Sequence, residues 1–309
     1  MPRAVRFRRY GGPEVLEVVD VPRPQPATGE IVVKVVAAAL NPGEIGIREG
    51  VFATMWPARF PEGQGNDFAG YVDELGPGVS GFEIGDQVVG YAPRRAQAEY
   101  VALSVEDVAH KPSGLAWEQA AAIAGVGATA WASVEAVKPA PGETVIVSAA
   151  AGGVGAIAAQ LSLLRGAQVI GTAGPGNFDF LRDLGVTPVA YGPGLVERLH
   201  TAAPGGVAAL IDTFGQGSVE AAVRLGVRPG RINTLADGRA VQVYGVHSDA
   251  QETVASSALY GRLANMAAEG KFFIPVERVY AMDQVQQAYR DVASRHGRGK
   301  RILSISPAG

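Results

Sequence analysis

The chain has 309 residues, a length typical of two domains, each with its own hydrophobic core. Apolar residues make up 47% and charged residues 18%, a composition that excludes a wholly disordered chain. The net charge is -3 and no basic block is present, which argues against a nucleic acid as the main partner. Cysteine is absent, so disulfides, thiolate metal ligands and thiol catalysis are excluded.

The first part of the sequence is predicted to be rich in β-strands. Short runs of β-branched residues lie at 15–21, 30–40, 86–92 and 98–104, with glycines dispersed between them. From Trp117 to Val137 the sequence is rich in alanine and lacks proline, which predicts a helix in one or two pieces.

From Thr144 onward, predicted strands and helices alternate, which is typical of a doubly wound parallel sheet. We expect strands within 144–149, 167–173, 186–192, 205–215 and 230–236, with helices within 156–166, 177–185 and 218–226.

A further strand is expected over 240–246, where AVQVYGV would end the parallel sheet and leave an apolar edge for a symmetry mate to cover. The tail then predicts a helix within 252–270, a strand within 272–280, a helix within 283–296 and a strand within 299–305. These last elements are expected to pack with the first part of the chain, which gives predicted domains of 1–115 and 116–255 and a return segment of 256–309.

The N-terminal segment MPRAVRFRRYGGPEV contains no apolar signal core. No stretch approaches the roughly 20 uninterrupted apolar residues that a membrane-spanning helix needs. We therefore expect a cytoplasmic protein that does not bind a membrane.

A glycine-rich turn carries the strongest functional signal. The run Ala150-Ala151-Gly152-Gly153-Val154-Gly155 follows a predicted strand and opens a predicted helix. Such a turn lets the backbone and the helix N-terminus approach a pyrophosphate, so a dinucleotide is the expected ligand. Ala150 stands in place of the usual first glycine, and the alternative is a glycine turn without a ligand.

The segment after the second predicted strand bears on the choice of cofactor. NADH-binding proteins usually place a carboxylate here for the ribose 2′-hydroxyl, but residues 171–177 contain no acid. Thr172, Gly174, Asn177 and Tyr191 could instead surround a 2′-phosphate, which favours NADPH. The alternative is a neutral turn that discriminates weakly between the two cofactors.

Several motifs together resemble a known family. They are GGPEVL (11–16), Asn41-Pro42, GNDFAGYV (65–72), GDQVVGY (85–91), AEYV (98–101), GATAW (127–131), AAAGGVG (149–155) and GRGKRILSI (297–305). With them, the chain resembles the zinc-independent medium-chain dehydrogenase/reductases of the quinone oxidoreductase (zeta-crystallin-like) group. The resemblance implies an α/β protein in which a GroES-like β domain, formed from both chain ends, joins a doubly wound Rossmann domain. It also implies NADPH in the cleft, a homodimer, and hydride transfer to a quinone or to a carbon–carbon double bond conjugated to a carbonyl.

No metal site is expected. Where zinc-using relatives bind their catalytic metal, this chain has Asn41, Asn66 and Gly125. The histidines are too far apart in sequence to form a local binding pair; they are His110, His200, His247 and His296.

Three residues are predicted to be catalytic. Asn41 is expected to contact the nicotinamide or the substrate oxygen, the alternative being a turn asparagine that bonds its own backbone. Glu44 stands where many relatives carry aspartate. Asp67 is expected to orient the cleft loop or, alternatively, to be a buried carboxylate that accepts backbone N–H bonds.

The remaining predicted cofactor contacts lie elsewhere in the chain. By resemblance Thr129 is expected near the nicotinamide, the alternative being a helix threonine that bonds the preceding turn. Lys300 is expected at the cofactor phosphates or, alternatively, as an exposed cation. Leu235 and Ala236, at the end of the predicted strand 230–236, complete the set.

These observations predict an NADPH-dependent, metal-free reductase acting on a small-molecule quinone or enone. One alternative is an enoyl-thioester reductase. A second alternative, from a different class, is a non-catalytic NADPH-binding sensor or structural protein.

Overall fold

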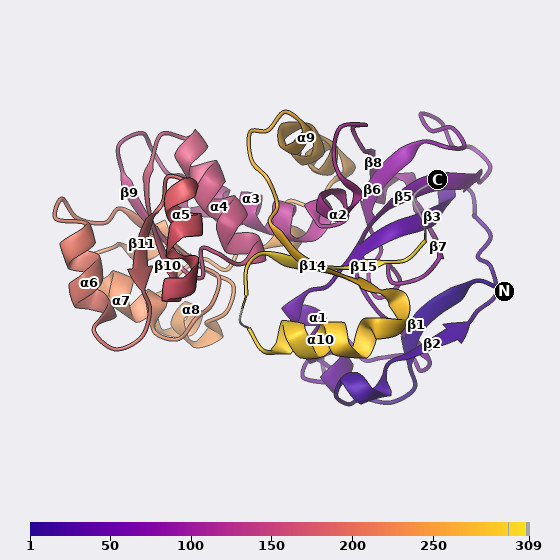
Figure 1. Cartoon of the computed structure of the whole chain (residues 1–309), viewed down its shortest axis with the longest axis horizontal. Helices are drawn as coiled ribbons and strands as arrows, with labels where there is room; N and C mark the ends of the chain where they lie inside the picture. Colours follow the sequence, from indigo (N-terminus) through magenta and orange to yellow (C-terminus); the bar gives the residue numbers. More distant parts are fainter. Residues whose placement is uncertain (296, 307–309) are drawn as a thin grey trace.

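The computed structural model describes residues 1–295 and 297–306 and shows an elongated molecule with a β-sheet in each half (Figure 1). Within this described part of the chain, no helix is long and apolar enough to cross a membrane.

One half is a parallel five-stranded sheet in the order β11-β10-β9-β12-β13. Its strands are mostly buried, as expected for a parallel sheet with helices on both faces. Chain order reverses at β9, so the carboxyl ends of β9, β10 and β12 meet where doubly wound folds bind their ligands. The elements are β9 (Thr144–Val147), α4 (Gly153–Leu164), β10 (Gln168–Ala173), α5 (Phe178–Asp183), β11 (Thr187–Ala190), α6 (Leu195–Ala202), β12 (Ala209–Asp212), α7 (Ser218–Arg224), β13 (Ile232–Thr234) and α8 (Gly238–Tyr244).

The other half contains a seven-stranded sheet in the order β14-β15-β3-β5-β6-β8, with β7 also paired to β3. A smaller antiparallel sheet, β2-β1-β4, lies beside it. The elements are β1 (Arg3–Phe7), β2 (Glu17–Asp20), β3 (Glu30–Ala39), α1 (Pro42–Glu49), β4 (Glu62–Gly63), β5 (Asp67–Leu75), β6 (Gln87–Tyr91), β7 (Tyr100–Ser104), β8 (Val108–His110), α9 (Ser257–Ala268), β14 (Val276–Ala281), α10 (Val285–Ala293) and β15 (Lys300–Ser304).

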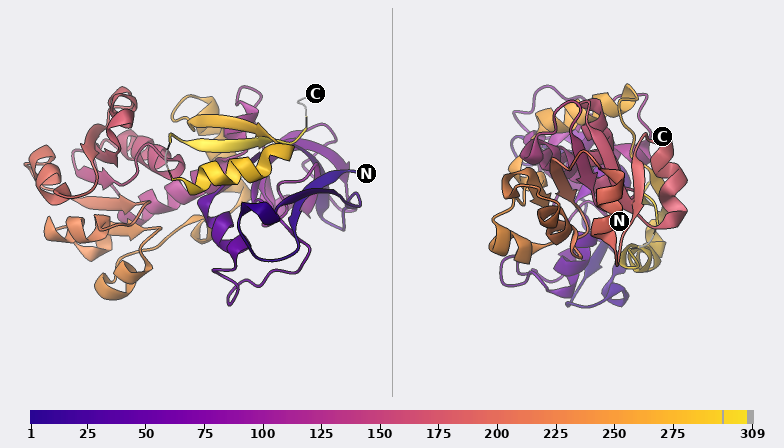
Figure 2. Two further views of the ribbon diagram at one scale, coloured as in Figure 1. Left: turned by 60° about the horizontal axis from the view of Figure 1, so that its bottom comes forward. Right: turned by 90° about the vertical axis from the view of Figure 1, so that its left-hand side faces the viewer.

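The end of the chain completes the sheet that its beginning starts. β15 pairs antiparallel with β3, and Ile302 lies opposite Ala39. Figure 2 shows β14, β15 and α10 packed on the β-rich half, as the sequence predicts. The predicted α/β fold with two different sheets is therefore confirmed, whereas the exact boundaries after residues 115 and 255 stay a prediction.

The alanine-rich segment after Trp117 joins the two halves. It forms α2 (Trp117–Ala120), a π-helical turn (Ile123–Gly127) and α3 (Ala128–Val137), so the predicted helix in pieces is confirmed. Its buried alanines share one hydrophobic cluster with Ala39 of the large sheet and Val147 of the parallel sheet. Both sheets therefore pack against the same helical segment.

The predicted strand over 240–246 is wrong, because residues 238–244 form α8. The alternating apolar pattern suggests a strand, but Asp237 caps a helix by accepting from the Ala240 N–H at 2.9 Å. Gly245, in the left-handed region at φ 66°, ends it. In the part of the chain that the structure describes, only His247 continues the parallel pairing beyond β13, as a bridge to Asn233.

Candidate functional site

A buried hydrogen-bond network holds together the carboxyl ends of three strands of the parallel sheet. Asp212, at the end of β12, accepts from Ser148 Oγ at 2.6 Å and from Thr234 Oγ1 at 2.7 Å. Its Oδ1 also accepts from the Gly215 N–H. The ends of β9, β12 and β13 are thereby fixed to one carboxylate. Sequence reasoning missed this network, although Asp212 lies within the segment 205–215 in which a strand is predicted.

The glycine turn lies at the carboxyl end of β9 and begins α4 at its N-cap, Gly152. A Cβ on Gly155 would lie 2.3 Å from the Ala149 carbonyl oxygen, so only glycine allows this approach of helix and strand. Ala149 itself adopts φ 45°, a left-handed conformation that is uncommon for alanine. The turn thus fits the pyrophosphate of a dinucleotide, because α4 begins at Gly152 and the first N–H groups of a helix have no partner within the helix.

The segment before β15 is bound to this turn. The Gly299 N–H donates to the Ala151 carbonyl at 2.8 Å, and Gly152 pairs with Gly299 as a parallel bridge. Lys300 comes next, and its Cδ lies 2.7 Å from where a Cβ on Gly153 would stand. Glycine at that position therefore makes room for the lysine side chain.

Lys300 is buried, with 3% of its surface exposed, and its ammonium group reaches the turn after β3. Nζ donates to the Leu40 carbonyl at 2.5 Å and to Asn41 Oδ1 at 2.7 Å. Burial lowers the lysine pKa, while Asp67 and Glu44 oppose that effect. The alternative that Lys300 is an exposed cation is wrong, and its predicted contact with the cofactor phosphates stays a prediction.

Asn41 connects three ionisable side chains. Its Nδ2 donates to Glu44 Oε1 and to Asp67 Oδ2, both at 3.0 Å, while its Oδ1 accepts from Lys300. The alternative of an asparagine that bonds its own backbone is therefore not what the structure shows. Both amide hydrogens already point to carboxylates, so Asn41 could donate to a substrate oxygen only by breaking one of these bonds.

The two carboxylates of this cluster are buried together. Burial raises the pKa of Asp67 to about 7, although Lys300 opposes the rise, and burial also raises the pKa of Glu44. Glu44 Oε2 accepts from Tyr289 at 2.5 Å, and burial holds the pKa of that tyrosine well above its ordinary value.

Asp67 differs from the expected carboxylate that accepts backbone N–H bonds. Its hydrogen bond comes from the Asn41 side chain, and within residues 1–295 and 297–306 its Oδ1 has no hydrogen-bond partner. A Cβ on Gly125 would lie 2.1 Å from Asp67 Oδ2. Glycine in the π-helical turn therefore leaves the space that this carboxyl group occupies.

The residues predicted at the adenosine end lie around the carboxyl end of β10. Thr172 is buried, and its Oγ1 accepts from the Ala149 N–H at 3.3 Å, so its hydroxyl supports the glycine turn. Gly174 and Asn177 are partly exposed, and Tyr191 is 49% exposed. A Cβ on Gly174 would lie 3.7 Å from the Tyr191 hydroxyl, which places these two residues side by side.

The remaining predicted contacts are Leu235, Ala236 and Thr129. Leu235 and Ala236 follow β13, and the Leu235 N–H donates to the Asp212 carbonyl at 2.8 Å. Thr129 lies in the first turn of α3, partly exposed. Its backbone carbonyl accepts from Ser133 Oγ at 2.9 Å.

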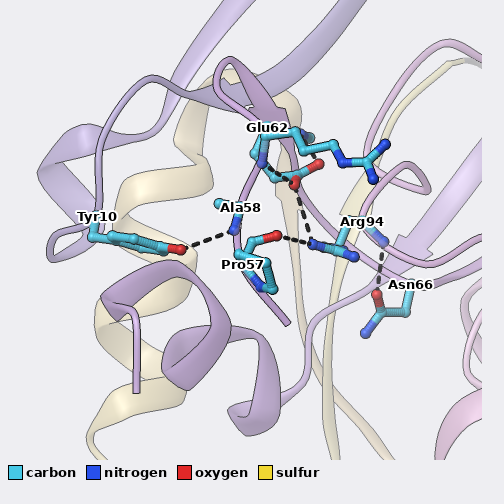
Figure 3. Close-up of polar contacts among 8 residues, drawn as sticks. Tyr10, Pro57, Ala58, Glu62, Asn66 and Arg94 are labelled. Carbon is cyan, nitrogen blue, oxygen red and sulfur yellow. Dashed lines mark hydrogen bonds and ion pairs between the residues drawn. The ribbon is translucent and has the colours of Figure 1, made fainter. Parts of the chain in front are cut away.

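Hydrogen bonds from Arg94 hold the loop that contains Pro57 and Ala58, in the β-rich half of the molecule (Figure 3). Arg94 Nη1 donates to the Pro57 carbonyl and to Glu62 Oε2, at 3.3 and 3.2 Å. The Arg94 backbone N–H donates to Asn66 Oδ1 at 2.9 Å, and Arg94 has a left-handed φ of 59°. The Ala58 N–H, in the same loop, donates to the Tyr10 hydroxyl oxygen at 2.8 Å. Sequence reasoning missed this role of Arg94.

Potential metal ligands do not gather in the part of the chain that the structure describes. No group of three His, Asp or Glu side chains there could hold a metal ion, and His296 lies outside the described residues.

Comparisons with known proteins identify the family. Residues 27–130 match the alcohol dehydrogenase GroES-like domain, and residues 183–303 match the zinc-binding dehydrogenase family. The chain is 36% identical to the chloroplastic quinone-oxidoreductase homolog of Spinacia oleracea, in an alignment that covers 60% of each protein. The chain thus aligns with less than two thirds of that relative.

Solved structures match along nearly the whole chain. The quinone oxidoreductase from Coxiella burnetii is 29% identical, with a TM-score of 0.89 and 99% of each chain covered. An NAD-dependent alcohol dehydrogenase is 31% identical, with a TM-score of 0.87 and 98% of this chain and 100% of that chain covered. Since both sheets, both family models and these structures agree with the resemblance, the chain belongs to the medium-chain dehydrogenase/reductases, an oxidoreductase family, in the quinone oxidoreductase group.

Proposed function

We propose that the protein is an NADPH-dependent, metal-free reductase of quinones or of carbon–carbon double bonds conjugated to a carbonyl. The family implies a nicotinamide cofactor, and the glycine turn before α4 fits its pyrophosphate. When bound, the reduced cofactor supplies the hydride.

The observation that carries the metal-free part of the proposal is the cluster around Asn41. Zinc-using relatives take metal ligands from this turn, whereas here the Asn41 amide is bonded to two carboxylates and to the Lys300 ammonium group. The Asn41 amide oxygen, the atom that could bind a metal, is held 2.7 Å from the Lys300 ammonium group, whose positive charge would repel a metal ion. Although one matching family model is described as a zinc-binding dehydrogenase, we therefore propose reduction of an activated acceptor.

In this proposal the residues of the chain bind and orient the reactants. Gly152, Gly153, Val154 and Gly155 would hold the pyrophosphate, and Ala150 would line the same turn. The adenosine end would lie against Gly174, Asn177 and Tyr191, whereas Thr129, Leu235 and Ala236 would lie near the nicotinamide end.

The buried cation would assist the reaction electrostatically. Negative charge develops on the acceptor oxygen during reduction, and the Lys300 ammonium group is held 2.7 Å from Asn41 Oδ1. A fixed positive charge in a buried site stabilises such charge without reorganisation of solvent. We propose that solvent water completes the protonation.

The experiment that tests the function is turnover with a panel of acceptors. NADPH oxidation would be followed with quinones, alkenals, cyclic enones, enoyl thioesters and simple alcohol–aldehyde pairs. Turnover of quinones or enones supports the proposal, and preference for enoyl thioesters would favour that alternative. Cofactor binding without turnover of any acceptor would overturn catalysis and leave the non-catalytic NADPH-binding protein.

A further inference from the structure

An arginine from the C-terminal segment lies beside the loop that follows β10. Arg298 precedes Gly299, whose N–H donates to the Ala151 carbonyl in the glycine turn. Arg298 Nε in turn donates to Asn177 Oδ1 at 3.3 Å. The segment that holds Lys300 in the buried cluster therefore also places a cation at the carboxyl end of β10.

The geometry of Arg298 leaves most of its donors available. Its guanidinium carbon lies 4.6 Å from the centre of the Phe180 ring, so the ring supports the planar group. The side chain is exposed, and no carboxylate within residues 1–295 and 297–306 forms an ion pair with it. Of the five N–H donors of a guanidinium group, one is used by Asn177.

The surroundings are suited to an anion. Residues 174–177 contain no acid, and Tyr191 adds a half-exposed hydroxyl beside Gly174. Two acids lie close by, and each is paired with another arginine. Asp179 is paired with Arg182 at 2.6 Å, and Glu277, which accepts from the Arg298 backbone N–H at 3.1 Å, is paired with Arg301 at 2.6 Å. In doubly wound folds the adenosine ribose lies at the end of the second strand, which here is β10.

We propose that Arg298 recognises the 2′-phosphate of NADPH and is the residue that sets cofactor preference. This inference rests on the proposed function, since it assigns a residue to the cofactor of that same site. A guanidinium group can bind a phosphate through two parallel charge-assisted hydrogen bonds, which a ribose hydroxyl cannot match. Arg298 thus supplies the cation that is missing from the sequence between Thr172 and Phe178.

The test is equilibrium binding, measured by calorimetry or by quenching of tryptophan fluorescence. Wild type and Arg298→Ala would be titrated with NADPH, NADH, adenosine 2′,5′-bisphosphate and AMP. Arg290→Ala is the matched control, because Arg290 is an exposed arginine on α10 whose side chain bonds Gln286. Loss of charge-assisted bonds to the phosphate should weaken NADPH and adenosine 2′,5′-bisphosphate roughly ten- to a hundredfold in the Arg298 variant. NADH and AMP should change less than about twofold, and the control should bind like wild type.

The outcomes separate this inference from the proposed function. Equal loss for NADPH and NADH would show that Arg298 only supports Asn177 and the loop, and unchanged NADPH affinity would show no phosphate contact. If the wild type binds NADPH, either result overturns the inference and leaves the proposed function intact. A wild type that binds neither nucleotide, or only NADH, would overturn the NADPH proposal itself and the role of Arg298 with it.

Discussion

The buried Asp67 carboxyl group is expected to make stability depend on pH. It is 0% exposed, and its pKa rises from the ordinary 3.8 to about 7 because burial disfavours the charged form. The folded protein then holds this proton at pH values where the unfolded chain has lost it, so stability falls as pH rises from about 4 through 7. One pKa unit corresponds to about 1.4 kcal/mol, so the rise from 3.8 to about 7 corresponds to about 4 kcal/mol of unfolding free energy.

Asp67→Asn removes this titration with little change in side-chain shape. Relative to the variant, the wild type should lose about 4 kcal/mol of unfolding free energy between pH 4 and pH 8, measured by urea denaturation at a series of pH values. Glu44, Lys300 and Tyr91, which interact electrostatically with Asp67, remain in both proteins. Asp20→Asn, at an exposed position on β2, is the control and should keep the wild-type profile. Parallel profiles for wild type and Asp67→Asn, or a wild type that gains stability with rising pH, would refute the reasoning.

Three further predictions concern the cofactor cleft and the assembly. Gly155→Ala should lower the unfolding free energy by about 1 to 3 kcal/mol in urea denaturation, because its Cβ would lie 2.3 Å from the Ala149 carbonyl. Gly230→Ala, whose Cβ would meet nothing within 4 Å, should have little effect, and equal stability of the two variants would contradict this account. Gly174→Asp should raise the Kd for NADPH at least tenfold in a binding titration while sparing NADH, whereas equal losses would count against a 2′-phosphate at this place. We also expect a homodimer from the family resemblance, although the strand first expected to form its interface is helix α8. Light scattering at micromolar concentration should show twice the monomer mass, and a monomer would refute the expectation.

Features that depend on local sequence could be predicted. The glycine turn between β9 and α4 is visible because its residues are consecutive and strand and helix patterns flank it. The order of strands and helices after Thr144 follows from similarly local patterns. Prediction fails where local signals conflict. Apolar residues alternate over 240–246 as in a strand, but Asp237 caps the start of a helix and Gly245 ends it.

Contacts between distant segments could not be predicted from the sequence. Lys300 and Asn41 are 259 residues apart, and Arg298 and Asn177 are 121 residues apart. Both pairs form because β15 joins the sheet of β3 and begins against the glycine turn. Residue type alone also could not show that both amide hydrogens of Asn41 are bonded to carboxylates.

The most direct test of metal-free hydride transfer uses NADPH deuterated at the transferable position of its nicotinamide, a cyclic enone, and protein dialysed against a strong chelator. Mass spectrometry of the product should show one deuterium on the carbon β to the carbonyl. The dialysed protein should reduce the enone at the same rate as undialysed protein. Reduced product without deuterium, or activity that is lost on chelation and restored by zinc, would contradict the account.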